Sequence, residues 1–561
     1  MEILAHTRDG RPRPEGEPVR LVLRAERLRL AERHEGEPGH TVLDGRVDTV
    51  DYQGQLARYF LSTGGITLQA INPLDRRPYP EGTNVQIRIR AQDCVVLDGH
   101  SDEPASNQEP AVMSAETAQR PPTHLFYQSR QRRPLLDRAE GIYMWDVEGR
   151  RYIDGCSGAM VSNIGHSNPR VLAAMNEQMQ RATFGYRLHF ENAPAETLAT
   201  RVAAAMPEGM DRVFFVSGGS ESVESCIKLA RQYALATGRG QRYKVISRYP
   251  SYHGATLGAL ALTGYTPMTA PFAPMMQESP KIPAPTCHLD RDGLTVDERG
   301  RRYADMLEDE ILRQGPETVL AFIMEPVGGA ATGALVAPDS YYPRVREICD
   351  RYGVLLIHDE VMSGAGRTGR FLASEHWDVI PDLIALSKGF AAGYAPLGAM
   401  VAPGWMVEPV LDAGGFIHGY TYAGNPLACA AGLAVLDEIE NQGLVANAAE
   451  MGELLKERLT GLMERFPFIG DVRGKGLLLA MELVADRETM APFPPERMAS
   501  PQLVELAYER GLILYWRRSR GGYRGDHVMV CPPLTVTAGQ IDEIMEPLTD
   551  ALSELARRLD A

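Results

Sequence analysis

The chain has 561 residues, of which 44% are hydrophobic and 23% are charged, and its formal net charge is −15. A chain of this length exceeds one typical hydrophobic core, so it predicts a globular protein of two or more domains. The acidic balance, with no compensating basic patch, argues against a nucleic-acid partner. No apolar run approaches the ~20 residues needed to cross a bilayer, and the first residues lack a signal-peptide pattern. We therefore expect a cytoplasmic protein without membrane insertion.

The cysteines predict a reduced protein. They lie far apart in the sequence, their number is odd, and none forms a C-x-x-C pair. Such spacing is typical of reduced thiols that mostly fill the core, and we assign no metal ligands. The seven are Cys94, Cys156, Cys226, Cys287, Cys349, Cys429 and Cys531.

Residues 1–100 predict a small all-β barrel domain. Short β-rich segments such as residues 20–24 (RLVLR) and 84–90 (NVQIRIR) are separated by Gly, Pro and Asp turns. In the second segment Val85, Ile87 and Ile89 fall on one face and polar residues on the other, which indicates a half-buried strand. The order of these segments resembles the TOBE domain that ends polyamine-type ABC transporter ATPases. The ATPase itself is absent, because the chain contains no G-x-x-x-x-G-K-[ST] phosphate loop.

Residues 101–123 are rich in Pro, Ala, Ser, Gln and Glu and predict a flexible linker. A second domain, residues 124–561, is expected to follow it. Residues 141–154 read as a hairpin with a Glu-Gly turn, and after it strands alternate with helices to the end of the chain. This alternation predicts an α/β fold with a mostly parallel sheet in a large domain, about residues 170–430. A smaller α+β domain would be assembled from residues 124–169 and 431–561.

A candidate anion site lies in residues 213–231. A short apolar strand (VFFV) is followed by a small turn (SGGS) and an amphipathic helix. This arrangement points free backbone N–H groups and the positive end of the helix dipole at an anion, so we expect Gly219 and Ser220 to bind a phosphate. The alternative is an ordinary turn in which Ser220 only caps the helix.

Residues 355–361 (LLIHDEV) and 382–388 (DLIALSK) are two short apolar runs that each end in charged residues. Buried parallel strands deliver functional groups to a sheet edge in this way, so Asp359 and Lys388 should be presented together. Pyridoxal phosphate (PLP) needs such a pair: a lysine to bind it covalently and a carboxylate to keep its ring nitrogen protonated. The alternative is two ordinary strands that end in solvated charges.

With these residues the chain resembles the class III, fold-type I, PLP-dependent aminotransferases. The resemblance rests on Asp-Glu-Val at residues 359–361, Gly-Arg-Thr-Gly at 366–369 and Ser-Lys at 387–388. It implies that Lys388 carries the cofactor and moves protons, that Asp359 holds the ring nitrogen, and that Glu224 lies near Asp359. The implied reaction transfers an amino group from a small amine, polyamine or ω-amino acid to a keto acid with ping-pong kinetics.

Residues 251–254 (SYHG) and 418–426 complete the expected cofactor site. An aromatic ring can cover one face of a flat cofactor, so we predict that Tyr252 stacks on it, with His253 beside it and Val361 on the opposite face. The segment around Thr421 resembles the family segment whose threonine reaches the phosphate of the other subunit. The smallest complete unit would then be a homodimer, alone or as a dimer of dimers.

The substrate pocket is less well defined by the sequence. The family's 2-oxoglutarate enzymes carry a glutamate shortly after Glu-Pro, whereas residues 327–332 (VGGAAT) contain none, which favours pyruvate as the acceptor. The family's carboxylate-binding arginine would fall at Gly522. Arg524 lies two residues along the same strand and could keep the same inward face.

Other arginines compete with Arg524 for this role, namely Arg517, Arg518 and Arg520, and a solvated basic loop is the alternative to all four. Two further residues are expected to line the pocket. Met160 follows Ala159 where the family has a Leu-Trp pair, and Phe126 would be supplied by the partner subunit.

Two other functions stay open from the sequence. The TOBE resemblance admits a transporter-associated regulatory protein whose aminotransferase-like body senses a ligand. The same cofactor architecture also serves decarboxylases and aminomutases.

Overall fold

A computed structural model describes residues 6–7, 20–23, 28–31, 40–53, 56–64, 66–73, 79–90, 94–97 and 123–560. Residue contacts divide the chain into two compact units, residues 1–130 and 131–561. Residues 101–122 of the predicted linker lie outside the described residues. The domain bounds drawn from the sequence stay predictions.

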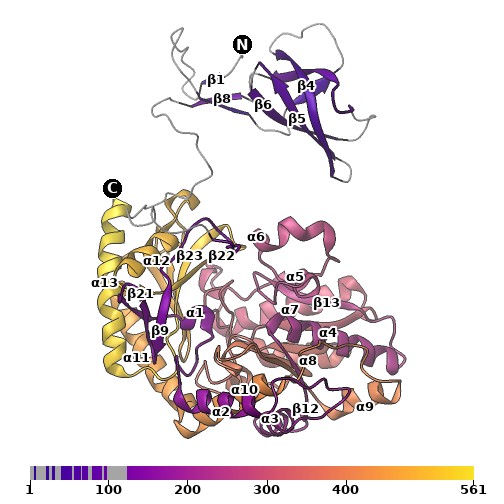
Figure 1. Ribbon diagram of the computed structural model, residues 1–561, viewed down its shortest axis with the longest axis vertical. Helices are drawn as coiled ribbons and strands as arrows, with labels where there is room; N and C mark the ends of the chain where they lie inside the picture. The colour runs from indigo at the N-terminus through magenta and orange to yellow at the C-terminus, as the bar shows by residue number, and fades with distance from the viewer. Residues whose placement is uncertain are drawn as a thin grey trace. The chain divides into compact units, whose positions relative to one another are not determined.

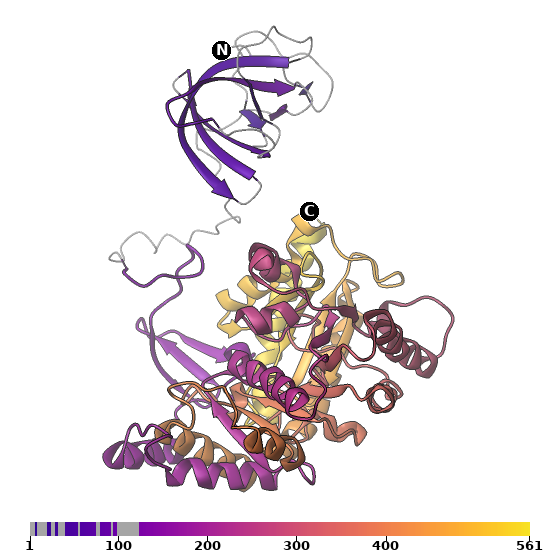
Figure 2. The same ribbon diagram turned by 90° about the vertical axis from the view of Figure 1, so that its right-hand side faces the viewer.

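The first unit is all-β in its described residues (Figure 1). A three-stranded sheet has the order β1-β8-β2, and a five-stranded sheet has the order β3-β7-β4-β5-β6. The edge strands β3 and β6 also approach each other, so the five strands curl around one apolar core (Figure 2). The strands are β1 His6–Thr7, β2 Arg20–Leu23, β3 Arg29–Ala31, β4 His40–Gln53, β5 Leu56–Thr63, β6 Ile66–Pro73, β7 Asn84–Arg90 and β8 Cys94–Leu97.

The alternation in β7 explains how this small core forms. Val85, Ile87 and Ile89 are buried, whereas Gln86 and Arg88 between them are partly exposed. Successive side chains of a strand point to opposite faces, so one face of β7 supplies the core and the other meets solvent. The predicted half-buried strand is confirmed.

A seven-stranded sheet forms the centre of the second unit, in the order β12-β18-β17-β16-β15-β13-β14. The strands from β17 to β14 are parallel, and β18 is antiparallel to both of its neighbours. Their apolar sequences are buried on both faces, as expected for a parallel sheet covered by helices. The strands are β12 Arg212–Val216, β13 Lys244–Tyr249, β14 Lys281–Pro283, β15 Val319–Met324, β16 Leu355–Asp359, β17 Leu383–Leu386 and β18 Gly398–Ala402.

Helices cover this sheet, and most of them follow a strand along the chain (Figure 1). The longer ones bury an apolar stripe against the strands, while their polar side chains face solvent. These helices are α3 Ala193–Ala204, α4 Gly219–Ala236, α5 Leu257–Leu262, α6 Thr266–Thr269, α7 Val296–Gln314, α8 Tyr341–Tyr352 and α9 Gly404–Asp412.

Two four-stranded sheets, β21-β11-β10-β9 and β19-β20-β23-β22, make up the small domain. Ile153 of β11 pairs in parallel with Leu512 of β21, so segments from the two ends of the unit share a sheet. The strands are β9 Leu136–Glu140, β10 Tyr143–Asp146, β11 Arg151–Asp154, β19 Ile469–Lys475, β20 Leu478–Leu483, β21 Leu512–Ile513, β22 Tyr515–Arg520 and β23 Arg524–Val530. The helices are α1 Ser157–Met160, α2 Pro169–Arg181, α10 Pro426–Asn441, α11 Leu444–Arg465, α12 Ala499–Glu509 and α13 Ala538–Asp560.

The predicted fold class is confirmed: a small all-β part precedes an α/β unit with a mostly parallel sheet and an α+β small domain. The six cysteines whose side chains are described are unpaired thiols, and five of them are buried. In the described part of the chain, none of the helices combines the length and apolar character that crossing a lipid bilayer requires.

Candidate active site

Asp359 and Lys388 lie at the same edge of the seven-stranded sheet. Strand β16 ends at Asp359, which is in register with Ala385 near the end of the parallel strand β17. Lys388 follows two residues after β17 and opens a short 3-10 turn, Lys388–Phe390. Its φ of 49° lies in the left-handed region, which is unusual for a residue with a side chain. The fold therefore holds the lysine beside the acid in a conformation that needs support from its surroundings.

The amine of Lys388 is weakly basic. Among the described residues it has no hydrogen-bond or ion-pair partner, and burial lowers its pKa to about 8. The nearby carboxylates of Asp359 and Glu325 oppose this shift because they favour the charged amine. A sizeable fraction of the amine is therefore neutral near pH 8, as a nucleophile or proton carrier requires.

Asp359 is buried and held from two sides. Its Oδ2 lies 2.8 Å from Nδ1 of His253, and its Oδ1 accepts a hydrogen bond from the backbone N–H of Val361 at 3.1 Å. A carboxylate can only accept, so Nδ1 of His253 carries the proton between them. His253 Nε2 is buried without a partner in the described residues. The imidazole therefore fixes the orientation of the acid.

The N-terminus of α4 has the geometry expected of an anion site. Gly218 is the N-cap, and a Cβ on Gly219 would lie 2.7 Å from Cγ1 of Val361, so only glycine fits there. The first N–H groups of a helix have no intrahelical acceptor and carry its positive dipole end. Ser220 does not cap the helix as the alternative proposed, because its Oγ accepts from the N–H of Ala255 at 3.0 Å.

Glu224, which the resemblance places near Asp359, hydrogen-bonds to the segment that opens α5. Its Oε1 accepts hydrogen bonds from Thr256 Oγ1 at 2.8 Å and from the N–H of Ala259 at 3.2 Å. Among the described residues no hydrogen bond joins it to Asp359, whose partner is His253. Glu224 therefore anchors the start of α5.

Tyr252 lies between the sheet edge and the small domain. Burial raises the pKa of its phenol, as do the neighbouring Tyr515 and Asp359, whereas the positive charge of Arg517 acts in the opposite direction. Its backbone N–H points at Oε2 of Glu325, 3.4 Å away. Tyr252 is therefore close enough to Asp359 for the two groups to interact. This position suits an aromatic ring that stacks on a cofactor held by Asp359.

Glu325 is a site residue that the sequence reasoning passed over. It is buried, its Oε1 accepts from the N–H of Gly329 at 2.9 Å, and burial raises the pKa of its carboxyl. Its place in the sequence indicates a site residue. Glu325 directly follows strand β15 and Asp359 ends the neighbouring parallel strand β16, so both lie at the same edge of the sheet.

Arg367, within the Gly-Arg-Thr-Gly motif, is another buried residue that went unassigned. It donates hydrogen bonds to the carbonyl of Pro532, to Asn163 Oδ1 and to Ser157 Oγ, and burial lowers its pKa to about 10. It therefore joins the loop after β16 to segments from both ends of the small domain.

The expectation that Arg524 points into the site is wrong. Strand β23 places Arg524 on the same face as Asp526 and Val528, and Val528 packs into the small-domain core. The opposite face of the β22–β23 pair carries Tyr515 and Met529, which pack toward the seven-stranded sheet. Arg524 is exposed. Residues 521–523 form the turn between β22 and β23, so position 522 and Arg524 do not lie along one strand as expected.

The remaining predicted residues occupy different environments. Met160 is 1% exposed and belongs to the apolar cluster against which Tyr515 packs. Thr421 is exposed, as is Phe126, whose side chain is 98% accessible.

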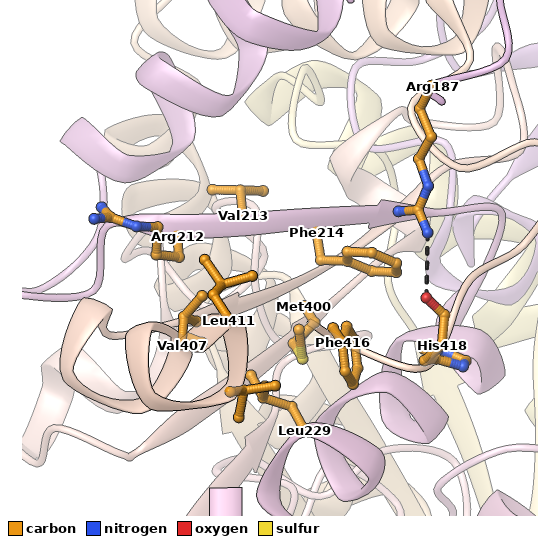
Figure 3. Close-up of a pocket in the computed structure, with 12 residues that line it drawn as sticks. Arg187, Arg212, Val213, Phe214, Leu229, Met400, Val407, Leu411, Phe416 and His418 are labelled. Carbon is orange, nitrogen blue, oxygen red and sulfur yellow. Dashed lines mark hydrogen bonds between the residues drawn. The ribbon is translucent and has the colours of Figure 1, made fainter. Parts of the chain in front are cut away.

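A cavity of about 330 Å³ lies apart from these residues (Figure 3). Apolar side chains of β12, α4 and α9 line it together with Phe416, and Arg187 closes one end by donating to the carbonyl of His418 at 3.2 Å. The cavity contains none of the predicted cofactor residues, so the candidate active site remains the edge at β16 and β17.

The donor set at this edge fits PLP. A weakly basic amine, a buried acid with an orienting imidazole, a half-buried tyrosine and a glycine-lined helix N-terminus meet the needs of its carbonyl, ring nitrogen, ring face and phosphate. The fold and the site together define an enzyme of the PLP-dependent transferase class.

Comparison with known proteins identifies the family. Residues 127–552 match the model of the class-III aminotransferases, and residues 21–97 match that of the TOBE domain. The chain belongs to the class-III aminotransferase family and is an aminotransferase that carries a TOBE domain before its catalytic unit. Members of this family depend on PLP.

Individual relatives agree with this assignment. An uncharacterized aminotransferase of Bacillus subtilis, YodT, is 39% identical over 76% of this chain and 96% of its own. A putrescine–pyruvate aminotransferase of Pseudomonas aeruginosa is 33% identical over 75% of this chain and 91% of its own. The crystal structure of an (S)-enantioselective omega-transaminase from Thermomicrobium roseum superposes with a TM-score of 0.72, at 38% identity over 77% of this chain and 96% of the other.

Proposed function

We propose that the protein moves an amino group from an amine, polyamine or ω-amino acid to pyruvate with ping-pong kinetics. The observation that carries this proposal is the pairing of Lys388 with Asp359 at neighbouring strand ends. PLP supplies the electron sink that makes a bond at the amine-bearing carbon labile. Pyruvate as acceptor is supported by the absence of a glutamate in residues 327–332 and by the relative named putrescine–pyruvate aminotransferase.

Each residue of the candidate active site has a separate role in the proposed reaction. Backbone N–H groups of Gly219 and Ser220 bind the phosphate, Tyr252 and Val361 enclose the ring between them, and Asp359 keeps the ring nitrogen protonated. His253 orients that acid. Lys388, when its amine is free, would take the proton from the amine-bearing carbon of the substrate and would return it in a 1,3-transfer to the carbon on the other side of the nitrogen. Its pKa of about 8 lets it hold and release that proton near neutral pH.

We further propose that the enzyme works as a homodimer in which Thr421 binds the phosphate in the other subunit. An apolar patch supports this: Phe184, Leu188, Phe190, Ile417 and Tyr422 are each 46–87% exposed. The rings of Phe184 and Tyr422 lie 5.9 Å apart, and Asn425 donates to the carbonyl of Thr183, so the two segments adjoin next to Thr421. Exposed apolar groups of this kind mark interaction surfaces.

A donor screen tests the function. The PLP-loaded enzyme is incubated with putrescine, cadaverine, 4-aminobutyrate or 1-phenylethylamine, each with pyruvate or 2-oxoglutarate, and the newly formed alanine or glutamate is measured. Alanine should form with at least one donor, and Lys388→Ala should form none. A fully loaded wild-type enzyme that forms neither product with any donor would contradict the proposal.

A further inference from the structure

Arg517, on β22, carries a half-buried positive charge without a counter-ion. Among the described residues its only hydrogen bond goes to the carbonyl of the adjacent Trp516, at 3.2 Å, and no carboxylate lies within ion-pair distance. A guanidinium taken partly out of water loses hydration that an anion would replace. The absence of a protein partner therefore suggests that the anion comes from a ligand.

The side chain of Arg517 points toward the active site. It shares a face of the hairpin with Tyr515 and with its cross-strand partner His527, and this face packs toward the seven-stranded sheet. The guanidinium carbon lies 4.6 Å from the centre of the Tyr515 ring. Its positive charge favours a lower pKa for the phenols of Tyr252 and Tyr265, whereas the negative charge of Asp359 raises the pKa of Tyr252. Arg517 and Asp359 therefore both act on the same residue, Tyr252, with charges of opposite sign.

The other arginines of the hairpin are engaged elsewhere. Arg518 donates to the carbonyl of Pro495 and lies 3.9 Å from Asp526, on the small-domain face. Arg520 donates to the carbonyl of Met490 and lies 3.7 Å from Glu482. Arg524 is exposed on the face of Asp526.

No side chain fits at position 522, where the family's arginine would fall. Gly522 has a φ of 90°, and a Cβ there would lie 2.4 Å from Cδ of Pro267 and 3.0 Å from the ring of Tyr265. The glycine lets the hairpin tip pack directly on the segment that precedes and opens α6. An arginine at this position would have to displace that segment.

We propose that Arg517 binds the carboxylate of the substrate, so that the acceptor is a keto acid with one carboxylate near this guanidinium; this inference rests on the proposed function. The planar fork of arginine pairs with a carboxylate through two parallel hydrogen bonds. Contact with the Tyr515 ring limits the rotation of the fork, and the nearby aromatic residues Tyr252 and Tyr265 carry no charge that could pair with it. An acid with a single carboxylate matches this arrangement, because Arg518 and Arg520 are engaged elsewhere and Arg524 is exposed on the other face.

The test compares two acceptors of equal length. Pyruvate and propanal each supply a carbonyl on a three-carbon chain, but only pyruvate has a carboxylate. In the holoenzyme, Arg517→Met should raise KM for pyruvate on the order of 10- to 100-fold, the loss expected for a hydrogen-bonded charge, and leave kcat/KM for propanal within about twofold. Arg524→Met is the matched control, and both of its values should stay at the wild-type level. Calorimetric titration with propanoate, which cannot accept an amino group, should show binding weakened in Arg517→Met alone.

Three results would overturn the proposal. An equal loss of kcat/KM for pyruvate and propanal in Arg517→Met would indicate a structural role. No change of kcat/KM for either acceptor, or a loss for pyruvate in Arg524→Met instead, would refute the role of Arg517. A wild-type holoenzyme inactive with both acceptors would contradict the proposed function separately. In that case the propanoate titration still decides, because equal binding by the wild type and Arg517→Met would refute the role of Arg517.

Discussion

Replacing Lys388 by methionine should make the cofactor-free protein more stable at neutral pH. Burial lowers the pKa of this amine from an ordinary 10.5 to about 8, so the folded state holds its proton less tightly than the unfolded chain does. Each pKa unit corresponds to 1.36 kcal/mol, and the shift therefore destabilises the wild-type protein by about 3 kcal/mol below pH 8. Methionine keeps the apolar stem and removes the charge. The site thus maintains a reactive amine at the expense of stability.

The sign of the pH dependence makes this prediction specific. Between pH 8 and 10.5 the unfolded chain binds more protons than the folded protein, so wild-type stability rises with pH across this window and the deficit closes. At pH 7 the variant should exceed the wild type by about 3 kcal/mol, and at pH 9.5 by about 1 kcal/mol.

Urea unfolding of the two apoproteins at both pH values, followed by tryptophan fluorescence, gives the two differences. Lys456→Met on α11 is the control, for which we expect no such pH-dependent gain. If Lys388→Met were no more stable than the wild type at pH 7, or if its advantage were the same at both pH values, burial would not be what weakens this amine.

Three further predictions follow from the site and its supports. Asp359→Asn should keep the fold and much of the cofactor yet lose turnover by orders of magnitude, since an amide cannot sustain a protonated ring nitrogen; near-normal steady-state rates would give the carboxylate another role. Gly522→Ala should lower the unfolding free energy in urea by about 1–3 kcal/mol, because its φ is 90° and its Cβ would meet Pro267 at 2.4 Å. Gly461→Ala, whose Cβ would meet nothing within 4 Å on α11, should not destabilise, and equal losses in both variants would refute the steric argument. A chain that begins at Pro122 should keep its dimeric state, cofactor content and turnover, because every predicted cofactor residue lies within positions 219–421; monomers in size-exclusion chromatography or a several-fold loss of rate would show that the first unit supports the site.

The residues of the candidate cofactor site were predictable because they sit where strands end. In a parallel sheet the carboxyl ends of neighbouring strands meet at one edge, so Asp359 and Lys388 could be brought together from two apolar runs and the residues that follow them. The helix start at Gly219 was equally local, since a strand, a small turn and an amphipathic helix are contiguous in the chain. Glu325 was predictable in the same way, because it directly follows another strand of this sheet, β15.

The substrate side could not be predicted in this way. Whether an arginine of β22 or β23 faces the site depends on which strand it occupies, on the length of the hairpin between them and on which face packs against the neighbouring sheet. The Gly-Asp segment at residues 525–526 favours Arg524 when only the sequence is considered, whereas the strand pairing places Arg517 opposite His527 on the inner face. A change of one residue in register reverses every face.

By itself, therefore, the sequence determined the fold class, the two kinds of domain and the residues that end the central strands, because apolar period, turn residues and strand termini are properties of contiguous segments. Only the tertiary structure decided the partners of those residues. His253, not Glu224, hydrogen-bonds to Asp359. Pro267 leaves no space for a side chain at position 522. Arg517 has no counter-ion among the described residues. These are contacts between segments distant in the chain, and they depend on packing and strand register that no local pattern encodes.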